Sequence, residues 1–319
     1  MFEARMPSLR SHEHLHPRKS LGQHFLRDAN IAHKIVAALS VQNQNLVLEI
    51  GPGEGALTSL LLATPARYII AVEYDTRAVA FLHTRFADEI AQGRLHIVQS
   101  DILRCSFQNL LPTRLSTDQS FSIVGNIPYY ITSDILFWIF EQWALQYVDT
   151  CCHAHQETPY LCKAVLMMQR EVAERIIAQP RTKAYGILSI ASSLVSTPAV
   201  LFDVSPQCFF PPPRVRSSVV SFQMRHTKEA AQHFRAVHPL VRIAFNQRRK
   251  ILANALARII PKQRLAELAT TEEIQKISYF RSRPEELTPY DFIRLHELLQ
   301  EFRFVSNVVP MQNDRCQRA

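Results

Sequence analysis

The sequence predicts a doubly wound α/β domain whose sheet has seven strands, followed by a smaller all-helical domain. Short β-branched and apolar segments alternate with helical patterns through the first two-thirds of the 319 residues, which is typical of a parallel sheet covered by helices. Three of only seven glycines, Gly51, Gly53 and Gly55, stand together between a strand pattern and a helical pattern. After about Arg225 the strand patterns end and only helical periodicity continues.

Each predicted strand is a short apolar run, and the helices between them have apolar positions at helical spacing. The predicted strands are Leu46–Ile50, Tyr68–Glu73, Leu95–Gln99, Phe121–Gly125, Ala164–Met168, Ala199–Val204 and Val219–Met224. The predicted helices of this domain are Ala56–Ala63, Arg77–Ala91, Ser133–Tyr147, Glu171–Ala178 and Ile187–Ser196. Because the last two strands follow each other closely, we expect an antiparallel edge.

In the C-terminal third of the chain, the sequence pattern predicts only helices. These are His233–Phe245, Arg248–Arg258, Lys262–Ala269, Thr271–Ser278 and Pro289–Phe302. We therefore expect a flexible N-terminal extension over 1–17, a ligand-binding domain over 18–225, a helical domain over 226–302 and a tail over 303–319. The segment Val148–Pro159 holds two cysteines and two histidines and is predicted to be a loop insertion. Its spacing does not favour a zinc site, and we expect no metal.

The amino-acid composition is that of a globular protein and excludes several other classes of protein. With 47% hydrophobic and 20% charged residues, the chain has the composition of a globular protein and not of a disordered, collagen-like or disulfide-stapled one. No apolar run approaches the roughly 18 residues that a membrane helix requires, and the N-terminus lacks the apolar segment of a secretory signal. Six cysteines without framework spacing suit a reducing compartment. We expect a cytoplasmic protein with no membrane partner.

The net charge of +8 is concentrated in the C-terminal part of the chain. Residues 1–203 hold 17 Lys and Arg against 18 Asp and Glu, whereas residues 204–319 hold 19 against 10. Between Leu240 and Arg264 there are seven basic side chains and no acidic one. A basic surface attracts phosphate backbones, although a solvated helix face is the alternative. The charge therefore indicates a polyanionic partner without naming it.

The glycine-rich segment Leu46–Thr58 predicts a ligand site. Glycines let the backbone approach a ligand closely, and the helix N-terminus that follows presents unpaired N–H groups. Glu73 lies at the end of the next strand, where a carboxylate can accept hydrogen bonds from ribose hydroxyls. The pattern fits a dinucleotide and also S-adenosylmethionine, and a tight turn without a ligand is the third alternative. Asp101, at the end of the third strand, either contacts an adenine amine or caps a helix.

The fourth predicted strand ends in Gly125-Asn126-Ile127-Pro128-Tyr129, a segment that indicates chemistry at an adenine amine. This nitrogen is a poor nucleophile because its lone pair is delocalised into the ring. The side-chain oxygen of Asn126 and the carbonyl of Ile127 can accept its two N–H bonds and favour a tetrahedral nitrogen. Pro128 fixes the turn, and Tyr129 can stack on a base that has left its helix. A turn that merely closes the strand is the alternative, but the acceptor pair favours S-adenosylmethionine over a dinucleotide.

Over about residues 18–302 the chain resembles the KsgA family of ribosomal RNA adenine N6,N6-dimethyltransferases. The segments that carry the resemblance are Lys19–Leu26, Gly51–Thr58, Val72–Asp75, Asn126–Tyr129, Lys183–Ser189, Phe209–Val215 and Phe245–Lys250. Related resistance methyltransferases acting on large-subunit rRNA share the first motifs, whereas the triple proline and the Asn-Gln-Arg-Arg-Lys run are more similar to the small-subunit enzymes. The resemblance implies a Rossmann-like class I S-adenosylmethionine-dependent methyltransferase fold.

The resemblance also implies roles for individual residues. Cofactor contacts are implied for Gln23, His24, Leu26, Gly51, Gly53, Glu73, Asp101 and Asn126. The implied catalytic residues are Asn126, Ile127, Pro128, Tyr129 and Phe209. Phe209 would join Tyr129 in sandwiching the adenine, with a core position for Phe209 as the alternative. The residues expected to bind RNA are Arg214, Arg248, Arg249 and Lys250. Many members have Asn where this chain has His24, which affects only the detail of that contact.

The implied reaction is dimethylation at N6 of two adjacent adenosines in a hairpin loop near the 3′ end of 16S rRNA, within an immature small subunit. In-line attack of the adenine nitrogen on a sulfonium methyl requires no metal or covalent intermediate. A monomer is expected. Two alternatives stay open: an adenine N6-methyltransferase acting on large-subunit rRNA or DNA, and a ribosome-assembly or transcription-associated protein that has kept the fold without the activity. The intact Gly51–Gly55, Glu73, Asp101 and Asn126–Tyr129 argue against the second.

Overall fold

The computed structural model describes residues 14–41, 46–111, 120–147, 160–257, 260–261 and 278–301. Several predicted segments lie outside these ranges: the helix Lys262–Ala269, nearly all of Thr271–Ser278, the insertion Val148–Pro159, the tail 303–319 and most of the extension 1–17. None of the helices within the ranges is long and apolar enough to span a membrane.

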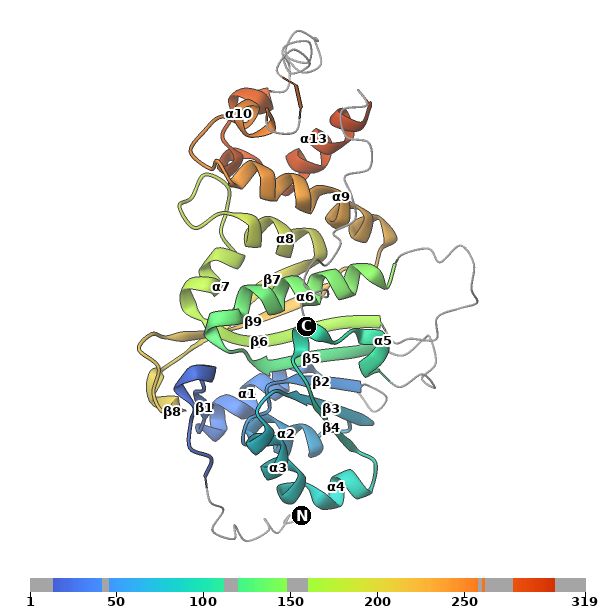
Figure 1. The fold of residues 1–319 in the computed structure, drawn as a ribbon, viewed down its shortest axis with the longest axis vertical. Helices are drawn as coiled ribbons and strands as arrows, with labels where there is room; N and C mark the ends of the chain where they lie inside the picture. Colours follow the sequence, from blue (N-terminus) through green and yellow to red (C-terminus); the bar gives the residue numbers. More distant parts are fainter. Residues whose placement is uncertain are drawn as a thin grey trace.

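A mixed sheet of seven strands forms the centre of the protein (Figure 1). In spatial order the strands are β4 (Leu95–Gln99), β3 (Tyr68–Glu73), β2 (Leu46–Ile50), β5 (Ser120–Asn126), β6 (Tyr160–Gln169), β9 (Ser217–Met224) and β7 (Ser196–Val204). The first five are parallel, and β9 is antiparallel to both β6 and β7. All seven predicted strands and the antiparallel edge are confirmed.

Helices cover both faces of the sheet and bury two apolar clusters. One face carries α1 (Ala29–Leu39), α2 (Ala56–Leu62) and α3 (Thr76–Arg85), and the other carries α5 (Phe107–Leu110), α6 (Thr132–Leu145), α7 (Arg170–Ile176) and α8 (Ile187–Val195). Successive strand residues point to opposite faces, so in β2 Val47 packs with the first set and Leu48 with the second. The parallel strands β3, β2, β5 and β6 are thus largely buried on both sides, whereas the edge strand β4 is partly exposed. The carboxyl ends of the parallel strands meet at one edge.

The C-terminal helices extend the α6 side of the molecule (Figure 1). They are α9 (Lys228–Phe245), α10 (Leu252–Leu256) and α13 (Pro289–Glu301). Their buried residues Phe234, Leu256 and Phe292 belong to the same apolar cluster as Trp143 of α6 and Ile190 of α8. The apolar core is therefore continuous across the predicted domain boundary at 225–226, which falls in the connection between β9 and α9.

Three predicted helices have clearly different limits in the structure. The helix expected from His233 begins five residues earlier, at Lys228, because Thr227 caps it there. The segment Arg77–Ala91 forms two helices, α3 and α4 (Ala87–Ala91), because Phe86 leaves the helical conformation with its ring buried. The helix expected from Arg248 begins only at Leu252, whose N–H donates to the carbonyl of Ser282 at 2.8 Å. Its predicted end, Arg258, lies outside the described residues. A long-range contact thus fixes the start of α10, and residues 246–250 form turns.

Two elements near the N-terminus were not predicted. One is α1, which begins after Asp28, whose side chain accepts a hydrogen bond from the Ile31 N–H. The other is a two-stranded ribbon, in which β1 (Phe25–Leu26) pairs antiparallel with β8 (Phe209–Phe210). A two-residue strand has no periodicity to detect, and its partner lies more than 180 positions away in the chain. The ribbon brings the N-terminal segment to the edge where the parallel strands end.

Candidate functional site

The loop between β2 and α2 contains three glycines with positive φ, Gly51 (68°), Gly53 (57°) and Gly55 (80°). A Cβ at Gly55 would lie 2.5 Å from the Phe86 ring, and one at Gly53 would lie 3.0 Å from the Phe25 ring. The backbone here combines a left-handed conformation with close packing, which glycine alone tolerates without strain. The sharp turn expected from the sequence is present.

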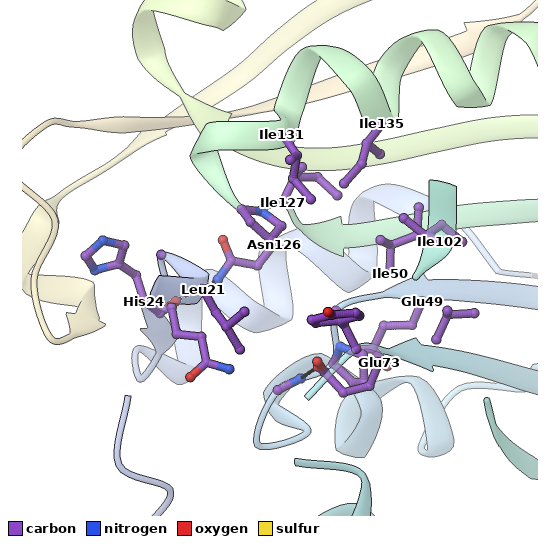
Figure 2. A pocket seen from close by; sticks show the side chains of 18 of the residues that line it. Leu21, His24, Glu49, Ile50, Glu73, Ile102, Asn126, Ile127, Ile131 and Ile135 are labelled. Atoms are coloured by element: carbon purple, nitrogen blue, oxygen red, sulfur yellow. Dashed lines mark hydrogen bonds between the residues drawn. The ribbon is translucent and has the colours of Figure 1, made fainter. Parts of the chain in front are cut away.

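This loop forms part of a cavity of about 380 Å³ at the carboxyl ends of the parallel strands, the edge where α/β sheets bind ligands. We call it the main pocket. Eleven predicted site residues line it: Gln23, His24, Leu26, Gly51, Gly53, Glu73, Asp101, Asn126, Ile127, Pro128 and Tyr129. Figure 2 shows His24 and Asn126 toward one end of the main pocket and Glu49 and Glu73 toward the other.

Glu73 ends β3, and its carboxylate is buried beside the glycine loop. One oxygen accepts a hydrogen bond from the Gly53 N–H (3.0 Å), and the other accepts one from the Asp75 N–H (2.8 Å). Burial raises the pKa of Glu73 in spite of these hydrogen bonds. Since each carboxylate oxygen has a further lone pair, this rigid group can still accept hydrogen bonds from ligand hydroxyls.

Asp101 follows β4, where it has the capping role that the sequence allowed and also faces the main pocket. Its Oδ1 accepts a hydrogen bond from the Leu103 N–H at 3.0 Å and caps the 3₁₀ turn Ile102–Arg104. The same residue lines the main pocket. Capping uses Oδ1 and holds the carboxylate in place. The other oxygen of Asp101 can therefore contact a ligand while the cap is kept.

Glu49 is a pocket residue that was not predicted. Only 1% of it is exposed, and the Thr58 hydroxyl donates to its Oε2 at 2.7 Å. Burial raises the pKa of Glu49 to about 7, with the neighbouring Glu73 charge adding to the shift. One signal in the sequence pointed to it, because Glu49 is the single charged residue in the otherwise apolar strand Leu46–Ile50. Burying a carboxyl group there requires a partner or a function.

Asn126 ends β5, and its amide has a fixed orientation. Its Nδ2 donates a hydrogen bond to the His24 carbonyl at 2.9 Å, so Oδ1 is the end of the amide left for a ligand. The next residue, Ile127, is anchored by a hydrogen bond from its N–H to the Met167 carbonyl of β6 (3.0 Å). The acceptor pair predicted from the sequence therefore lies at the end of β5, where the backbone of His24 and of β6 holds it.

Tyr129 is held on two sides. Its hydroxyl lies 2.6 Å from the Ser217 hydroxyl at the start of β9, and burial raises the pKa of the phenol. The His24 ring stacks on Tyr129 with centroids 5.6 Å apart, while His24 Nδ1 donates to the Pro211 carbonyl at 2.7 Å. The tyrosine ring thus has a set position in the pocket wall.

The segment His14–Leu26 runs across the glycine loop and is tied to it by polar contacts. The Leu15 N–H donates to the buried Glu54 carboxylate (2.9 Å), and Arg77 donates to the His16 carbonyl (3.0 Å). Gln23 Nε2 donates to Asp75 (3.0 Å). The N-terminal segment is thus held against the site by the two loops at the ends of β2 and β3.

Phe209 does not line the main pocket. It is 4% exposed and packs in the apolar cluster beneath α1, paired across the ribbon with Leu26. The core position that the sequence left as an alternative is the one observed, and a stacking role for Phe209 stays a prediction. The exposed aromatic residues of the pocket wall are Tyr74 and Tyr130, which were not predicted from the sequence. Each directly follows a predicted site residue, Glu73 or Tyr129.

The four predicted RNA-binding residues lie outside the main pocket and differ from one another. Arg214 is exposed in the connection between β8 and β9, and Arg249 and Lys250 are exposed in the turn before α10. Arg248 is half-buried: its Nε donates to Glu285 at 2.6 Å, and its guanidinium also donates to the Thr182 carbonyl at 3.1 Å. Of the three consecutive basic residues 248–250, Arg248 is therefore held by an ion pair, whereas Arg249 and Lys250 are exposed.

Among the residues that the structure describes, no group of three His, Cys, Asp or Glu side chains is placed to hold a metal ion. Cys105, Cys162 and Cys208 are free thiols. The cysteines and histidines of the segment 148–159 lie outside the described ranges.

Comparison with known proteins identifies a family model and similar sequences. The model described as ribosomal RNA adenine dimethylase matches residues 15–301. A protein named ribosomal RNA small subunit methyltransferase A from Coxiella burnetii is 34% identical over 283 residues, covering 88% of this chain and 97% of that protein. The protein of the same name from Porphyromonas gingivalis is 36% identical, covering 89% and 98%.

Two solved structures share the fold. A dimethyladenosine transferase from Plasmodium falciparum has a TM-score of 0.65 at 24% identity, covering 88% of this chain and 98% of that one. The 23S rRNA methyltransferase ErmE has a TM-score of 0.56 at 23% identity, covering 86% and 99%. Both comparisons extend over the sheet and the C-terminal helices, so the predicted fold class is confirmed.

Proposed function

This chain belongs to the ribosomal RNA adenine dimethylase family, and we propose that it methylates adenine N6 in small-subunit rRNA with S-adenosylmethionine as methyl donor. The proposed targets are two adjacent adenosines in a hairpin loop near the 3′ end of 16S rRNA, each of which receives two methyl groups. The observation that carries the proposal is the orientation of Asn126. Its Nδ2 donates to the His24 carbonyl, so Oδ1 is left to accept a hydrogen bond from an adenine amine.

S-Adenosylmethionine fits the residues of the main pocket. The volume of about 380 Å³ lies within the range of roughly 300–1,000 Å³ that is usual for small-molecule sites. Glu73 would accept hydrogen bonds from the ribose hydroxyls, and Asp101 one from the cofactor's adenine amine. The buried Glu49 and Glu73 carboxyl groups suit a ligand that carries positive charge, because a nearby cation favours their ionised forms. When bound, the cofactor supplies a methyl group on a sulfonium, which needs no further activation before nucleophilic attack.

The chain's own residues would position the target nitrogen. Asn126 Oδ1 and the Ile127 carbonyl would accept its two N–H bonds, which favours a tetrahedral nitrogen and stabilises the positive charge that develops on it. Tyr129 would stack on the base, and its contacts with Ser217 and His24 fix its ring in advance. The proton leaves after attack, so a strong general base is not needed. The second transfer requires only that the pocket admit a singly methylated nitrogen.

Further features support the proposed substrate. Three exposed cations would contact RNA phosphates: Arg214, Arg249 and Lys250. Arg248 lies next to Arg249 and is held by Glu285 and the Thr182 carbonyl. A target base must leave its stack to enter the main pocket, which costs less in an incompletely folded RNA, and this favours an immature subunit in the cytoplasm. We also propose that the protein acts as a monomer.

The test uses immature small subunits that lack the modification. Purified protein and radiolabelled S-adenosylmethionine should incorporate four methyl groups per subunit, and primer extension should stop at two adjacent adenosines near the 3′ end of 16S rRNA. Large-subunit rRNA and DNA serve as competing substrates. Label in either of these, or in another part of 16S rRNA, would overturn the proposed target. Cofactor binding without any transfer would favour a binding protein that has lost activity.

A further inference from the structure

A second cavity is lined by residues in and near the β1–β8 ribbon. The ribbon itself lies at the edge of the molecule (Figure 1). The volume of the cavity is about 370 Å³, and it is lined by His14, Leu15, His16, Arg27 and Phe210. Phe210 is 51% exposed, whereas its neighbour Phe209 is buried in the core. None of the five residues is used by the proposed mechanism. Phe210 thus presents a large aromatic surface in this cavity.

The second cavity is continuous with the wall of the main pocket. Phe210 pairs across the ribbon with Phe25, which lines the main pocket. The residue after Phe210, Pro211, accepts the hydrogen bond from His24, whose ring stacks on Tyr129. A short chain of direct contacts thus joins Phe210 to the ring proposed to hold the target adenine. A strand of RNA whose adenine occupies the main pocket would pass close to this cavity.

The chemistry of the second cavity favours a flat, uncharged ring. The Arg27 guanidinium lies over the Phe210 ring, 5.7 Å from its centroid. Two nitrogens of Arg27 also bind the Glu54 carboxylate, at 2.8 and 3.0 Å, so its charge is largely neutralised and is poorly suited to a phosphate. What the cavity offers is an exposed aromatic face with a guanidinium and two imidazoles beside it. Nucleobases stack on such surfaces with little regard to sequence.

We propose that Phe210 and this second cavity form a stacking subsite for a nucleobase that flanks the target adenosine in the RNA strand. The inference rests on the proposed function, since it requires an RNA substrate in the main pocket. The subsite would hold the strand on the side of His24 and Tyr129, and so help to keep the target adenosine unstacked. It would therefore act on RNA binding and not on the transfer step.

The test compares Phe210→Ala with Phe210→Trp, which keeps an aromatic face. Phe210→Ala should raise the KM for immature small subunits about tenfold, while kcat and the Kd for S-adenosylmethionine stay within twofold of wild type. Phe210→Trp should keep the wild-type KM. In a hairpin RNA carrying 2-aminopurine at each flanking position in turn, one position should change its fluorescence on binding to wild type and to Phe210→Trp but not to Phe210→Ala.

The matched control is Leu201→Ala, which removes an exposed apolar side chain from the edge strand β7 and should leave every quantity unchanged. The thermal midpoints of all variants show whether each is folded. If wild type methylates small subunits but Phe210→Ala has an unchanged KM and an unchanged fluorescence response, the subsite is wrong and the proposed function stands. A change in cofactor Kd alone would assign the second cavity to the cofactor site. If wild type itself fails to methylate small subunits, the proposed function fails first.

Discussion

The main pocket and the basic turn before α10 use charged groups in opposite ways. In the pocket, Glu49 and Glu73 are buried, and each is held by a hydrogen bond from the protein at 2.7–3.0 Å. In the turn, Arg249 and Lys250 are exposed to solvent. A buried polar group that loses its hydrogen-bond partner destabilises the protein, because its desolvation is no longer compensated. The charge of an exposed cation is screened by salt, and its side chain can change conformation. The difference matches two tasks, since methyl transfer needs fixed directions and phosphate binding needs charge.

This comparison implies different responses to substitution. A change in the main pocket should act through the loss of directed hydrogen bonds and should depend little on salt, because the groups are shielded from ions. A change in the basic turn should act on RNA affinity alone and should vary strongly with salt, because it alters the number of phosphates neutralised. The four predictions below test this division, from the largest expected effect to the smallest.

Asn126→Ala should have the largest effect, because it removes an acceptor aimed at the reacting nitrogen. We expect kcat to fall about 10²- to 10³-fold, the usual loss for one group that stabilises charge in a transition state. The Kd for S-adenosylmethionine should rise much less, since Glu73 and the glycine loop are unchanged. Single-turnover transfer to small subunits and equilibrium cofactor binding measure the two quantities separately.

Asn109→Ala is the matched control for this prediction. It removes an exposed asparagine side chain on α5 and should leave both kcat and Kd unchanged. Near-wild-type transfer by Asn126→Ala would remove the main support for the proposed mechanism. It would also contradict the contrast between the hydrogen-bonded groups of the main pocket and the exposed cations of the basic turn.

Glu73→Ala should weaken cofactor binding about 10- to 100-fold, the range expected when hydrogen bonds to a charged group are lost. It removes the acceptor for the Gly53 and Asp75 N–H groups as well as the one proposed for the ribose. Glu73→Gln keeps an acceptor oxygen and should recover part of the affinity. Calorimetric titration with S-adenosylmethionine measures both, and equal affinities in all three proteins would show that Glu73 only shapes the loop.

The sequence predicted the residues of the main pocket better than those around it, and the reason is physical. Gly53 and Asn126 lie in short local patterns, and each pattern has one geometry at the end of a parallel strand. Arg248 also lies in a local pattern, but its partner Glu285 is 37 positions away, so composition alone could not separate it from Arg249. Phe209 and Phe210 could not be distinguished either, because the ribbon that buries the first and exposes the second depends on pairing with residues 25–26.

The double substitution Arg249→Ala with Lys250→Ala should weaken RNA binding about tenfold near physiological salt. It should also reduce the slope of log affinity against log salt by about 1.5, since each phosphate contact contributes roughly 0.7–0.9. Arg248→Ala should instead lower stability by up to about 1 kcal/mol through loss of its ion pair with Glu285 and should change the slope less. Binding measured at several salt concentrations, with thermal melts, separates the two effects. An equal slope change for Arg248→Ala would place that guanidinium on the RNA.

Glu49→Gln should change the pH dependence of stability in the cofactor-free protein. Burial raises the pKa of Glu49 from 4.5 to about 7, so the folded protein keeps a proton that the unfolded chain releases. The stability that this proton contributes is therefore complete below about pH 4.5 and is lost as the pH rises to about 7. Glutamine stays uncharged, so the thermal midpoint of the variant should fall less than that of wild type between pH 5 and pH 8.

The expected difference in thermal midpoint is a few degrees, and it includes the loss of the repulsion between Glu49 and Glu73. Glu171→Gln, which alters an exposed carboxylate on α7, should follow the wild-type profile. If saturating S-adenosylmethionine removes most of the difference at pH 8, the ligand's positive charge stabilises the ionised Glu49. Parallel profiles for wild type and Glu49→Gln would mean that Glu49 is ionised throughout, and that the buried carboxylates of the pocket titrate like those on the surface.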